Sequence, residues 1–317
     1  MISLEDIQAA ARIVYANMPP TPQYRWPLLC EKLSADVYVK HENQTPVGAF
    51  KIRGGLVYFS DLEKSGEKPA GVISATRGNH GQSIGFAASL HDIPCTVVVP
   101  HGNSIEKNNA MRALGVELVE YGDDFQESLE HARVLAEEHS LHMVPSFHPL
   151  LIAGVATYAL ELFNAVEDLH TVYVPIGLGS GICGVVAARD ALGLDTRVVG
   201  VVSAHATAYS QSFKTGRLVE SPVSTWLADG MACRTPQTGA LDIIARGVER
   251  IVEVSDDEVA AAMRLMFECT HNTCEGAGAA ALAAAMQDQS RNSGLRIAVI
   301  ASGGNVDRDV FAKVLGS

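Results

Sequence analysis

The sequence predicts an α/β protein with two lobes, each a parallel or mostly parallel sheet covered by helices. Short apolar runs rich in Val and Ile alternate with longer amphipathic runs along most of the chain, which is the pattern of repeated βα units. Such units imply parallel strands with helices on both faces of the sheet. The 317 residues also exceed the roughly 250–300 at which a single core usually stops growing. We therefore expect two lobes that share a cleft.

The N-terminal segment predicts a capped helix followed by an extended stretch. Ser3 and Asp6 form a capping box, and apolar residues recur on one face as far as Asn17. The proline-rich segment 18–27 (MPPTPQYRWP) then breaks helicity, so we expect it to run extended over the surface.

Strands and helices alternate from there to the end of the chain. Apolar runs predict strands at 37–40, 71–75, 95–100, 116–121, 143–144, 171–176, 197–202, 251–254 and 297–301. Helices are predicted at 82–90, 104–114, 125–138, 150–165, 182–191, from a second capping box at 255–258 onward, 277–286 and 307–315. The segment 204–247 is less regular and predicts no element.

Composition, charge and cysteine usage exclude several classes of protein. A net charge of −12 argues against a nucleic acid partner, which would need a basic face. The longest apolar stretch, 276–286, is too short and too rich in Gly and Ala to cross a bilayer, so we expect no membrane partner. Six cysteines contain no C-x-x-C pair, and Glu5 and Asp6 do not suit a signal peptide. We therefore expect a cytoplasmic chain.

A glycine-rich turn between a predicted strand and a predicted helix is a candidate phosphate site. Residues 174–184 read VPIGLGSGICG, and closely spaced glycines let backbone N–H groups approach an anion at a helix N-terminus. The turn also contains the dinucleotide fingerprint at Gly179, Gly181 and Gly184, which would suit a nicotinamide-dependent dehydrogenase. Against that alternative, the next predicted strand ends in SAH, with no acidic residue to bind a ribose. A purely structural turn is a third interpretation.

Lys51 is a candidate for covalent catalysis because of its neighbours. It lies between Phe50 and Ile52 in the segment GAFKIRGG. A lone lysine is most often solvated, but an aromatic and aliphatic setting would desolvate the amine. Desolvation lowers the pKa of an amine, as imine formation requires.

Two further turns follow apolar runs. In SATRGNHGQS (74–83), polar side chains and N–H groups suit a carboxylate or a phenolate, although a plain helix cap is an equally good interpretation. In IAVIASGGN (297–305), Ser302 follows a buried strand, at the edge where ligands bind in such sheets; a turn serine is the plainer alternative. Together the segments match the groups of pyridoxal phosphate. Lys51 suits its aldehyde, Asn79 its phenolic oxygen, Ser302 its pyridine nitrogen, and the amides of 177–181 its phosphate.

Four motifs in this order, AFKIRGG, TRGNHGQ, GLGSG and SGGN, resemble the serine/threonine dehydratase family of fold-type II pyridoxal-phosphate enzymes, which also includes serine racemase. The likeness runs from Thr21 to about Asp307. It implies a tryptophan synthase β-like fold, pyridoxal 5'-phosphate as cofactor, and a homodimer of the short form without a regulatory domain. The implied reaction is dehydration of a small 3-hydroxy amino acid, such as threonine, serine or 3-hydroxyaspartate, to a 2-oxo acid and ammonia. We expect residues 1–48 and 146–317 to form a large cofactor-binding domain and 49–145 a small domain with the substrate loop.

The resemblance also implies a role for each motif residue. Lys51 would be the Schiff-base lysine and, once free, the base that removes the α-proton, while Phe50 would flank the ring. Asn79 would bond the phenolic oxygen and Ser302 would face the pyridine nitrogen. The phosphate would be held by the backbone of Gly177, Leu178, Gly179, Ser180 and Gly181. The substrate carboxylate would be bound by the turn that contains Thr76, Arg77, Gly78, Asn79 and His80. An acidic residue near the ring would be Glu275.

Departures from the family pattern bear on metal binding and racemisation. Val202 and Ala208 stand where many relatives bind a divalent cation through acidic side chains. A hard cation needs oxygen ligands, and the histidines show no metal-ligand spacing either, so we expect no metal site. Arg77 stands where the racemase has a serine, and its proton is held too tightly for acid–base catalysis. We expect racemisation, the alternative within the family, to be weak or missing. Arg77 either pairs with a polar or anionic substrate side chain, or it braces the turn or points into water.

Overall fold

Two separate sheets organise the chain, which is described here by a computed structural model covering residues 2–64, 66 and 68–317. The larger sheet has six strands in the order β1-β2-β10-β7-β8-β9, and among them only β1 pairs antiparallel to its neighbour. Its strands are β1 (Gln23–Arg25), β2 (Asp36–His41), β7 (Thr171–Pro175), β8 (Arg197–Ser203), β9 (Arg250–Val254) and β10 (Arg296–Ala301). The smaller sheet is parallel throughout, in the order β5-β4-β3-β6. It consists of β3 (Val72–Ala75), β4 (Cys95–Val99), β5 (Glu117–Glu120) and β6 (His142–Met143).

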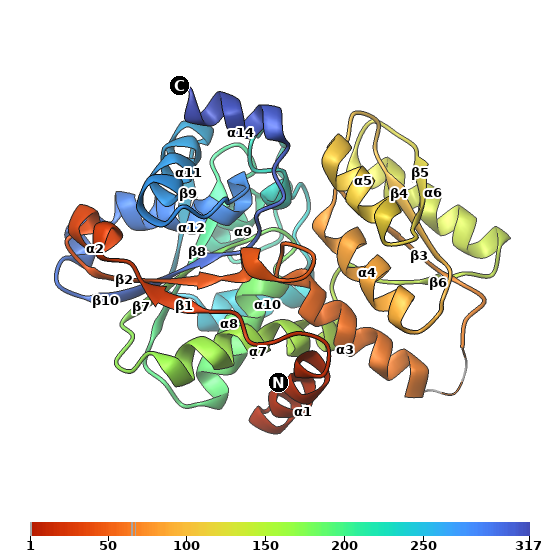
Figure 1. Cartoon of the computed structure of the whole chain (residues 1–317), viewed down its shortest axis with the longest axis horizontal. Coiled ribbons are helices and arrows are strands. Elements are labelled where there is room, and N and C mark those ends of the chain that lie inside the picture. Colours follow the sequence, from red (N-terminus) through yellow and green to blue (C-terminus); the bar gives the residue numbers. More distant parts are fainter. Residues whose placement is uncertain (1, 65, 67) are drawn as a thin grey trace.

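Helices cover both faces of each sheet, and the two lobes lie side by side (Figure 1). The helices are α1 (Leu4–Tyr15), α2 (Pro27–Leu33), α3 (Lys51–Lys64), α4 (Asn79–Leu90), α5 (Ile105–Ala113), α6 (Phe125–Glu138), α7 (Pro149–Ala165), α8 (Ser180–Ala191), α9 (Ala208–Thr215), α10 (Thr238–Gly247), α11 (Asp256–Thr270), α12 (Gly276–Gln287), α13 (Gln289–Asn292) and α14 (Arg308–Leu315). Two short 3-10 helices are η1 (Glu42–Gln44) and η2 (Asp229–Met231). No helix within the described residues is long and apolar enough to span a membrane.

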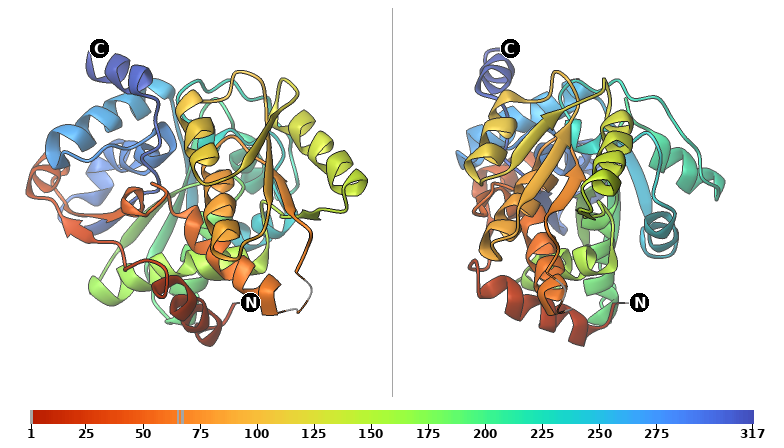
Figure 2. Two further views of the ribbon diagram at one scale, coloured as in Figure 1. Left: turned by 45° about the vertical axis from the view of Figure 1, so that its right-hand side comes forward. Right: turned by 90° about the vertical axis from the view of Figure 1, so that its right-hand side faces the viewer.

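The central strand β10 shows why the large sheet is buried on both faces. Ile297, Val299 and Ala301 pack in one core with α11 and α12, whereas Ala298 and Ile300 pack in the other core with α7 and α8. Side chains of a strand alternate between its faces, so a continuous apolar run fills both cores. In the small lobe, the sheet lies between α6 on one face and α4 and α5 on the other, as Figure 2 also shows.

The two-lobed α/β architecture with mostly parallel sheets is confirmed, and so are both capping boxes, at Ser3 and at Ser255. The domain boundaries at 48/49 and 145/146 stay a prediction. Several elements were not expected from the sequence: β1, α2, α3, and the helices α9 and α10 inside the irregular segment 204–247.

Helix α3 escaped prediction because Gly54 and Gly55 lie inside it, and glycine is a poor helix former. In the fold these glycines serve close packing. A Cβ at Gly54 would lie 2.9 Å from the carbonyl oxygen of Leu151 in α7, and one at Gly55 would lie 2.4 Å from Oγ of Ser83 in α4. The glycines therefore let α3 pack tightly between helices of the two lobes.

Candidate active site

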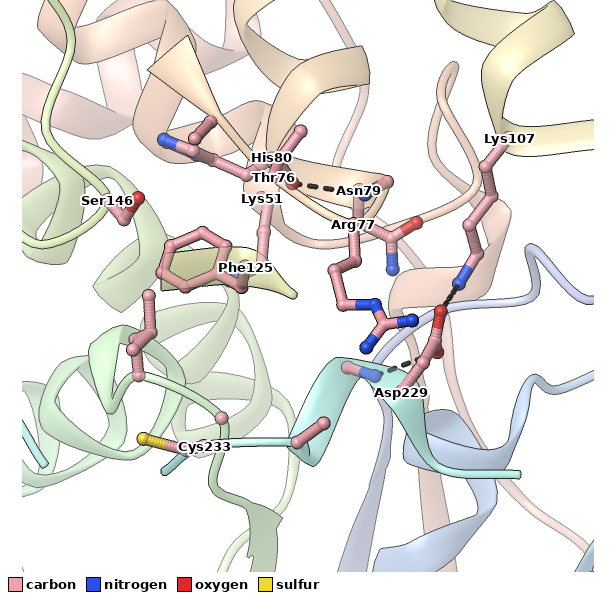
Figure 3. Close-up of a pocket in the computed structure, with 16 residues that line it drawn as sticks. Lys51, Thr76, Arg77, Asn79, His80, Lys107, Phe125, Ser146, Asp229 and Cys233 are labelled. Atoms are coloured by element: carbon pink, nitrogen blue, oxygen red, sulfur yellow. Dashed lines mark hydrogen bonds and ion pairs between the residues drawn. The ribbon is translucent and has the colours of Figure 1, made fainter. Parts of the chain in front are cut away.

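A cavity between the lobes is lined by residues from both of them (Figure 3). The small lobe supplies the turn from β3 into α4, and the large lobe supplies the turn from β7 into α8 and the segment around η2. The carboxyl ends of parallel strands are where such sheets bind ligands. Eight of the predicted site residues line its wall: Lys51, Thr76, Arg77, Gly78, Asn79, His80, Gly177 and Leu178. The other predicted residues do not line this cavity: Phe50, Gly179, Ser180, Gly181, Glu275 and Ser302.

Lys51 is the first residue of α3, and its amine lies against an aromatic ring. The Nζ atom is 4.8 Å from the centroid of the Phe50 ring. Burial lowers the pKa of Lys51 from 10.5 to about 8, although the negative charge of Glu275 acts in the opposite direction. Roughly a tenth of the Lys51 amine is therefore uncharged at pH 7, far more than for a lysine of ordinary pKa, and the uncharged form is the one that a nucleophile or a base requires.

Phe50, next to Lys51 in the chain, contacts two other segments of the site, the end of β10 and the start of α8. Its backbone N–H donates to the carbonyl oxygen of Ser302 at 3.1 Å, at the end of β10. A Cβ built on Gly181 would lie 3.5 Å from Cζ of the Phe50 ring, in ordinary contact. Ser302 is buried, and among the described residues its hydroxyl makes only a long hydrogen bond of 3.4 Å, to the carbonyl of Ala277. That hydroxyl can therefore turn toward a better partner.

The glycine turn lies closer to the segment around η2 than a side chain at position 177 would permit. A Cβ at Gly177 would lie 2.3 Å from the carbonyl oxygen of Gly230, and Gly179 has a φ of +102°. The hydroxyls of two buried tyrosines bind carbonyls of this turn: Tyr209 binds that of Leu178 at 2.9 Å, and Tyr158 that of Gly181 at 3.1 Å. The N–H groups in the first turn of α8 have no acceptor within the helix, so they suit an anion.

Asn79 is held by the large lobe at both ends of its amide. Its Nδ2 donates to Oε1 of Glu275 at 2.5 Å, and its Oδ1 accepts from Nδ2 of Asn305 at 2.9 Å. An amide nitrogen carries two hydrogens, so one donor of Asn79 is left for a ligand.

Lys107 of α5 completes this network. Its Nζ lies 2.9 Å from Oε2 of Glu275 and 2.7 Å from Oδ2 of Asp229. Burial by itself would lower the pKa of Lys107, but the two carboxylates outweigh burial and raise it. Burial raises the pKa of Glu275, and Lys107 opposes that rise. Two large-lobe carboxylates thus share one small-lobe cation.

His80 and Arg77 carry buried nitrogen atoms without partners. Burial, and secondarily the charge of Lys51, lower the pKa of His80 to about 3, so its ring is neutral. A hydrogen bond with the backbone of Pro145 opposes that shift. His80 Nε2 and Arg77 Nε have no hydrogen-bond partner in the described part of the chain. Unpaired buried polar atoms are costly, which indicates that the cavity is shaped for a polar ligand.

Val202 and Ala208, the positions that the family resemblance associates with a cation, do not line this cavity. Val202 packs in the core beneath α8, and Ala208 is buried in α9. Among the described residues, no group of three or more His, Cys, Asp or Glu side chains is placed to hold a metal. The absence of a cation site stays a prediction.

Comparison with known proteins decides the family. A family model described as "Pyridoxal-phosphate dependent enzyme" matches residues 15–303. The chain belongs to this family. It is 36% identical to an L-threonine ammonia-lyase of Geobacter sulfurreducens over 90% of this chain and 71% of the relative. It is 32% identical to an L-threo-3-hydroxyaspartate ammonia-lyase of a Pseudomonas species over 99% of this chain and 98% of the relative. The structure of processed threonine deaminase isoform 2 from Solanum lycopersicum superimposes with a TM-score of 0.91 at 30% identity, covering 99% and 91% of the two chains.

The cofactor of this pyridoxal-phosphate dependent enzyme is pyridoxal phosphate, and the cavity has the groups to hold it. The amine with a lowered pKa, the turn that only glycine can form at Gly177, and the spare donor of Asn79 face one space. Family membership overturns the nicotinamide-dependent alternative that the glycine fingerprint raised.

Several residues of the enzyme's cavity were indicated by no motif: Lys107, Phe125, Ser146, Asp229 and Cys233. Lys107 lies in the predicted helix 104–114, where a solvated lysine would look the same in the sequence. Asp229 lies in the irregular segment 204–247, where the sequence offered no signal either.

Proposed function

We propose that this enzyme dehydrates a small 3-hydroxy amino acid, such as threonine, serine or 3-hydroxyaspartate, to a 2-oxo acid and ammonia. The relatives named ammonia-lyases and threonine deaminase support this reaction class along nearly the whole chain. The observation that carries the proposal is the amine of Lys51, which is desolvated beside Phe50 and has a pKa lowered to about 8. In this proposal Lys51 holds the cofactor covalently and afterwards moves the α-proton.

Pyridoxal phosphate supplies an electron-withdrawing ring that weakens the α-C–H bond of an attached amino acid. The Lys51 amine is suited to take that proton because its pKa of about 8 lies near a working pH. Gly177 to Gly181 would hold the phosphate through backbone N–H groups at the start of α8. The spare hydrogen of Asn79 would bind the phenolic oxygen.

Ser302 favours elimination over transamination in this proposal. A hydroxyl is neutral, so it does not keep a pyridine nitrogen protonated as firmly as a carboxylate would. Beside the neutral Ser302 the bound cofactor would be a weaker electron sink, which would disfavour a long-lived carbanion. Transamination, which needs such a carbanion, would then compete less well with loss of the hydroxyl.

The turn from β3 into α4 would bind the substrate carboxylate. Its N–H groups lie at the start of a helix, where an anion is favoured. The N–H of Gly78 already binds Oγ1 of Thr76 at 3.0 Å, which fixes the shape of the turn. His80 contributes a neutral ring whose Nε2 is free to meet the substrate.

The test has a chemical part and a catalytic part. Borohydride reduction of the holoenzyme, followed by peptide mapping, is expected to fix the cofactor on Lys51 and not on the exposed Lys64 of the same helix. A panel of 3-hydroxy amino acids should release 2-oxo acid and ammonium. The Lys51→Ala variant should lose this activity, whereas Lys64→Ala should keep it. An unlabelled Lys51 would overturn the proposal.

Racemisation is the alternative reaction within this family. It requires a proton donor on the second face of the substrate, and Arg77 is a poor one. Incubation in deuterated water separates the two, because a racemase returns deuterium to the α-carbon of recovered substrate of both hands. We expect little such return.

We also propose that the enzyme works in the cytoplasm as a homodimer. The net charge of −12 and six free cysteines, five of them buried, support a reducing compartment without nucleic acid partners. The dimer rests on the family resemblance. Sedimentation of the holoenzyme tests the dimer, and fractionation of the source cells tests the compartment.

A further inference from the structure

Arg77 is a charged side chain of the cavity that forms no ion pair with a described residue. It lies on the turn between β3 and α4, and Figure 3 shows its guanidinium extending into the cavity toward the segment that carries Asp229. Its Nε is buried without a hydrogen-bond partner. No ion pair links Arg77 to a carboxylate anywhere in the ranges 2–64, 66 and 68–317.

The carboxylates nearest to the cavity are already committed elsewhere. Asp229 and Glu275 both bind the ammonium of Lys107, at 2.7 and 2.9 Å, and Glu275 also accepts from Asn79. A guanidinium carries a positive charge at any working pH. Among the described residues no carboxylate pairs with the guanidinium of Arg77, so the cavity offers this charge to an anionic ligand.

An arginine that braced the turn would hydrogen-bond to it, but Nε of Arg77 has no hydrogen-bond partner among the described residues. The turn is instead fixed by the bond from the Gly78 N–H to Thr76 and by the bonds of Asn79 to the large lobe. In the proposed function, the substrate's α-carboxylate would have the backbone N–H groups of this turn as partners. Arg77 thus remains available for a second anionic group.

We propose that Arg77 selects a 3-hydroxy amino acid whose side chain ends in a carboxylate. This inference rests on the proposed function and narrows its substrate class to 3-hydroxy dicarboxylic amino acids. The planar guanidinium presents two parallel N–H donors, which fit the two oxygens of a carboxylate. One cation suits one singly charged group, so a carboxylate fits better than a phosphate ester.

The reaction balances without a further reactant. The α-C–H and the β-C–O bonds break and one water leaves. A second water then hydrolyses the resulting enamine, the C–N bond breaks, and ammonia is released with a 2-oxo dicarboxylic acid. No oxidant or reductant takes part.

The catalytic test compares two substrates across matched variants of the holoenzyme. We expect the unaltered enzyme to prefer 3-hydroxyaspartate to threonine in kcat/KM. Arg77→Ala should lower kcat/KM for 3-hydroxyaspartate by about 10–100-fold relative to threonine, the range of hydrogen bonds to charged groups. Arg77→Lys should recover part of this loss, since it restores the charge without the planar pair of donors. Arg133→Ala, at an exposed arginine of α6, serves as the control and should change neither value.

A binding test keeps this inference separate from the proposed function. Malonate, a dianion without an amine, should bind the holoenzyme more tightly than acetate, and Arg77→Ala should abolish the difference, as read from the cofactor's absorbance. If no 3-hydroxy amino acid yields a 2-oxo acid, the proposed function fails while malonate binding still tests Arg77. Three results would overturn the inference: a preference for threonine, an equal loss on both substrates in Arg77→Ala, or malonate binding that does not depend on Arg77. An equal loss would place Arg77 on the α-carboxylate.

Discussion

Replacing Lys107 by methionine removes one charge from the centre of the site and leaves the shape of the side chain nearly unchanged. Lys107 is 5% exposed and Glu275 is 2% exposed, so neither group is compensated by water. Removing one partner from a buried ion pair costs about 3–5 kcal/mol, since the other charge stays buried and unpaired. We therefore expect Lys107→Met to lower the free energy of unfolding by about that amount at pH 8.

The pH dependence of that loss follows from Glu275. Without Lys107, burial raises the pKa of Glu275 in the folded state further above its unfolded value. Protonation removes the charge of Glu275 and with it the free-energy cost of burying that charge, and protonation becomes easier as the pH falls. The penalty is therefore largest above the folded pKa and disappears below the unfolded pKa. The deficit of Lys107→Met should be smaller at pH 5 than at pH 8.

Urea unfolding of the apoenzyme at both pH values, for the unaltered chain and each variant, measures this difference. Lys214→Met is the matched control, because Lys214 also binds a carboxylate at 2.8 Å, that of Glu253, but is 64% exposed. An exposed pair contributes about 0–1 kcal/mol, so the control should stay near the unaltered chain. A Lys107→Met deficit no larger than that of Lys214→Met, or one that is equal at the two pH values, would refute the reasoning.

Two further predictions concern the cofactor site. In the apoenzyme, reductive labelling of Lys51 by an aldehyde should reach half its maximal rate near pH 8, well below the pKa of 10.5 of an ordinary lysine side chain. Mass spectrometry of the Lys51 peptide measures this rate, and a half-maximal rate reached only near pH 10.5 would contradict the lowered pKa of Lys51. Gly177→Ala should weaken binding of pyridoxal phosphate about 10-fold or more, because overpacking costs about 1–3 kcal/mol and the new Cβ would meet the carbonyl oxygen of Gly230 at 2.3 Å. Absorbance titration measures this affinity, with Gly316→Ala at the C-terminal end of α14 as the control. An unchanged affinity in Gly177→Ala would contradict the prediction, because it would show that the backbone of the turn moves to accommodate the added methyl group.

The sequence was most informative where burial dictates the residue type. The run IAVIA predicts a strand at 297–301, and β10 covers Arg296–Ala301, because a strand buried on both faces has to be apolar throughout. Helix α3 could not be predicted, since its glycines lower local helix propensity and are stabilised only by contacts with α4 and α7. Tertiary packing outweighed local preference there.

The candidate active site likewise contains some residues that could be predicted from the sequence and others that could not. Turns that require glycine leave a local mark, so GLGSG and SGGN could be recognised from the sequence. The Lys107 network leaves no such mark, because its partners lie 122 and 168 positions away along the chain, counted from 107 to Asp229 and to Glu275. A surface lysine in helix α5 would look the same in the sequence. Only the packing of α5 against the large lobe brings these charges together.

The amide of Asn79 belongs to the small lobe, yet both of its partners, Glu275 and Asn305, belong to the large one. Any hinge motion that parts the lobes must stretch these two bonds before it admits a molecule from solvent. Asn79, which would contact the cofactor, would then lose these hydrogen bonds when the cavity opens. The same side chain would therefore take part both in binding the cofactor and in controlling entry to the cavity.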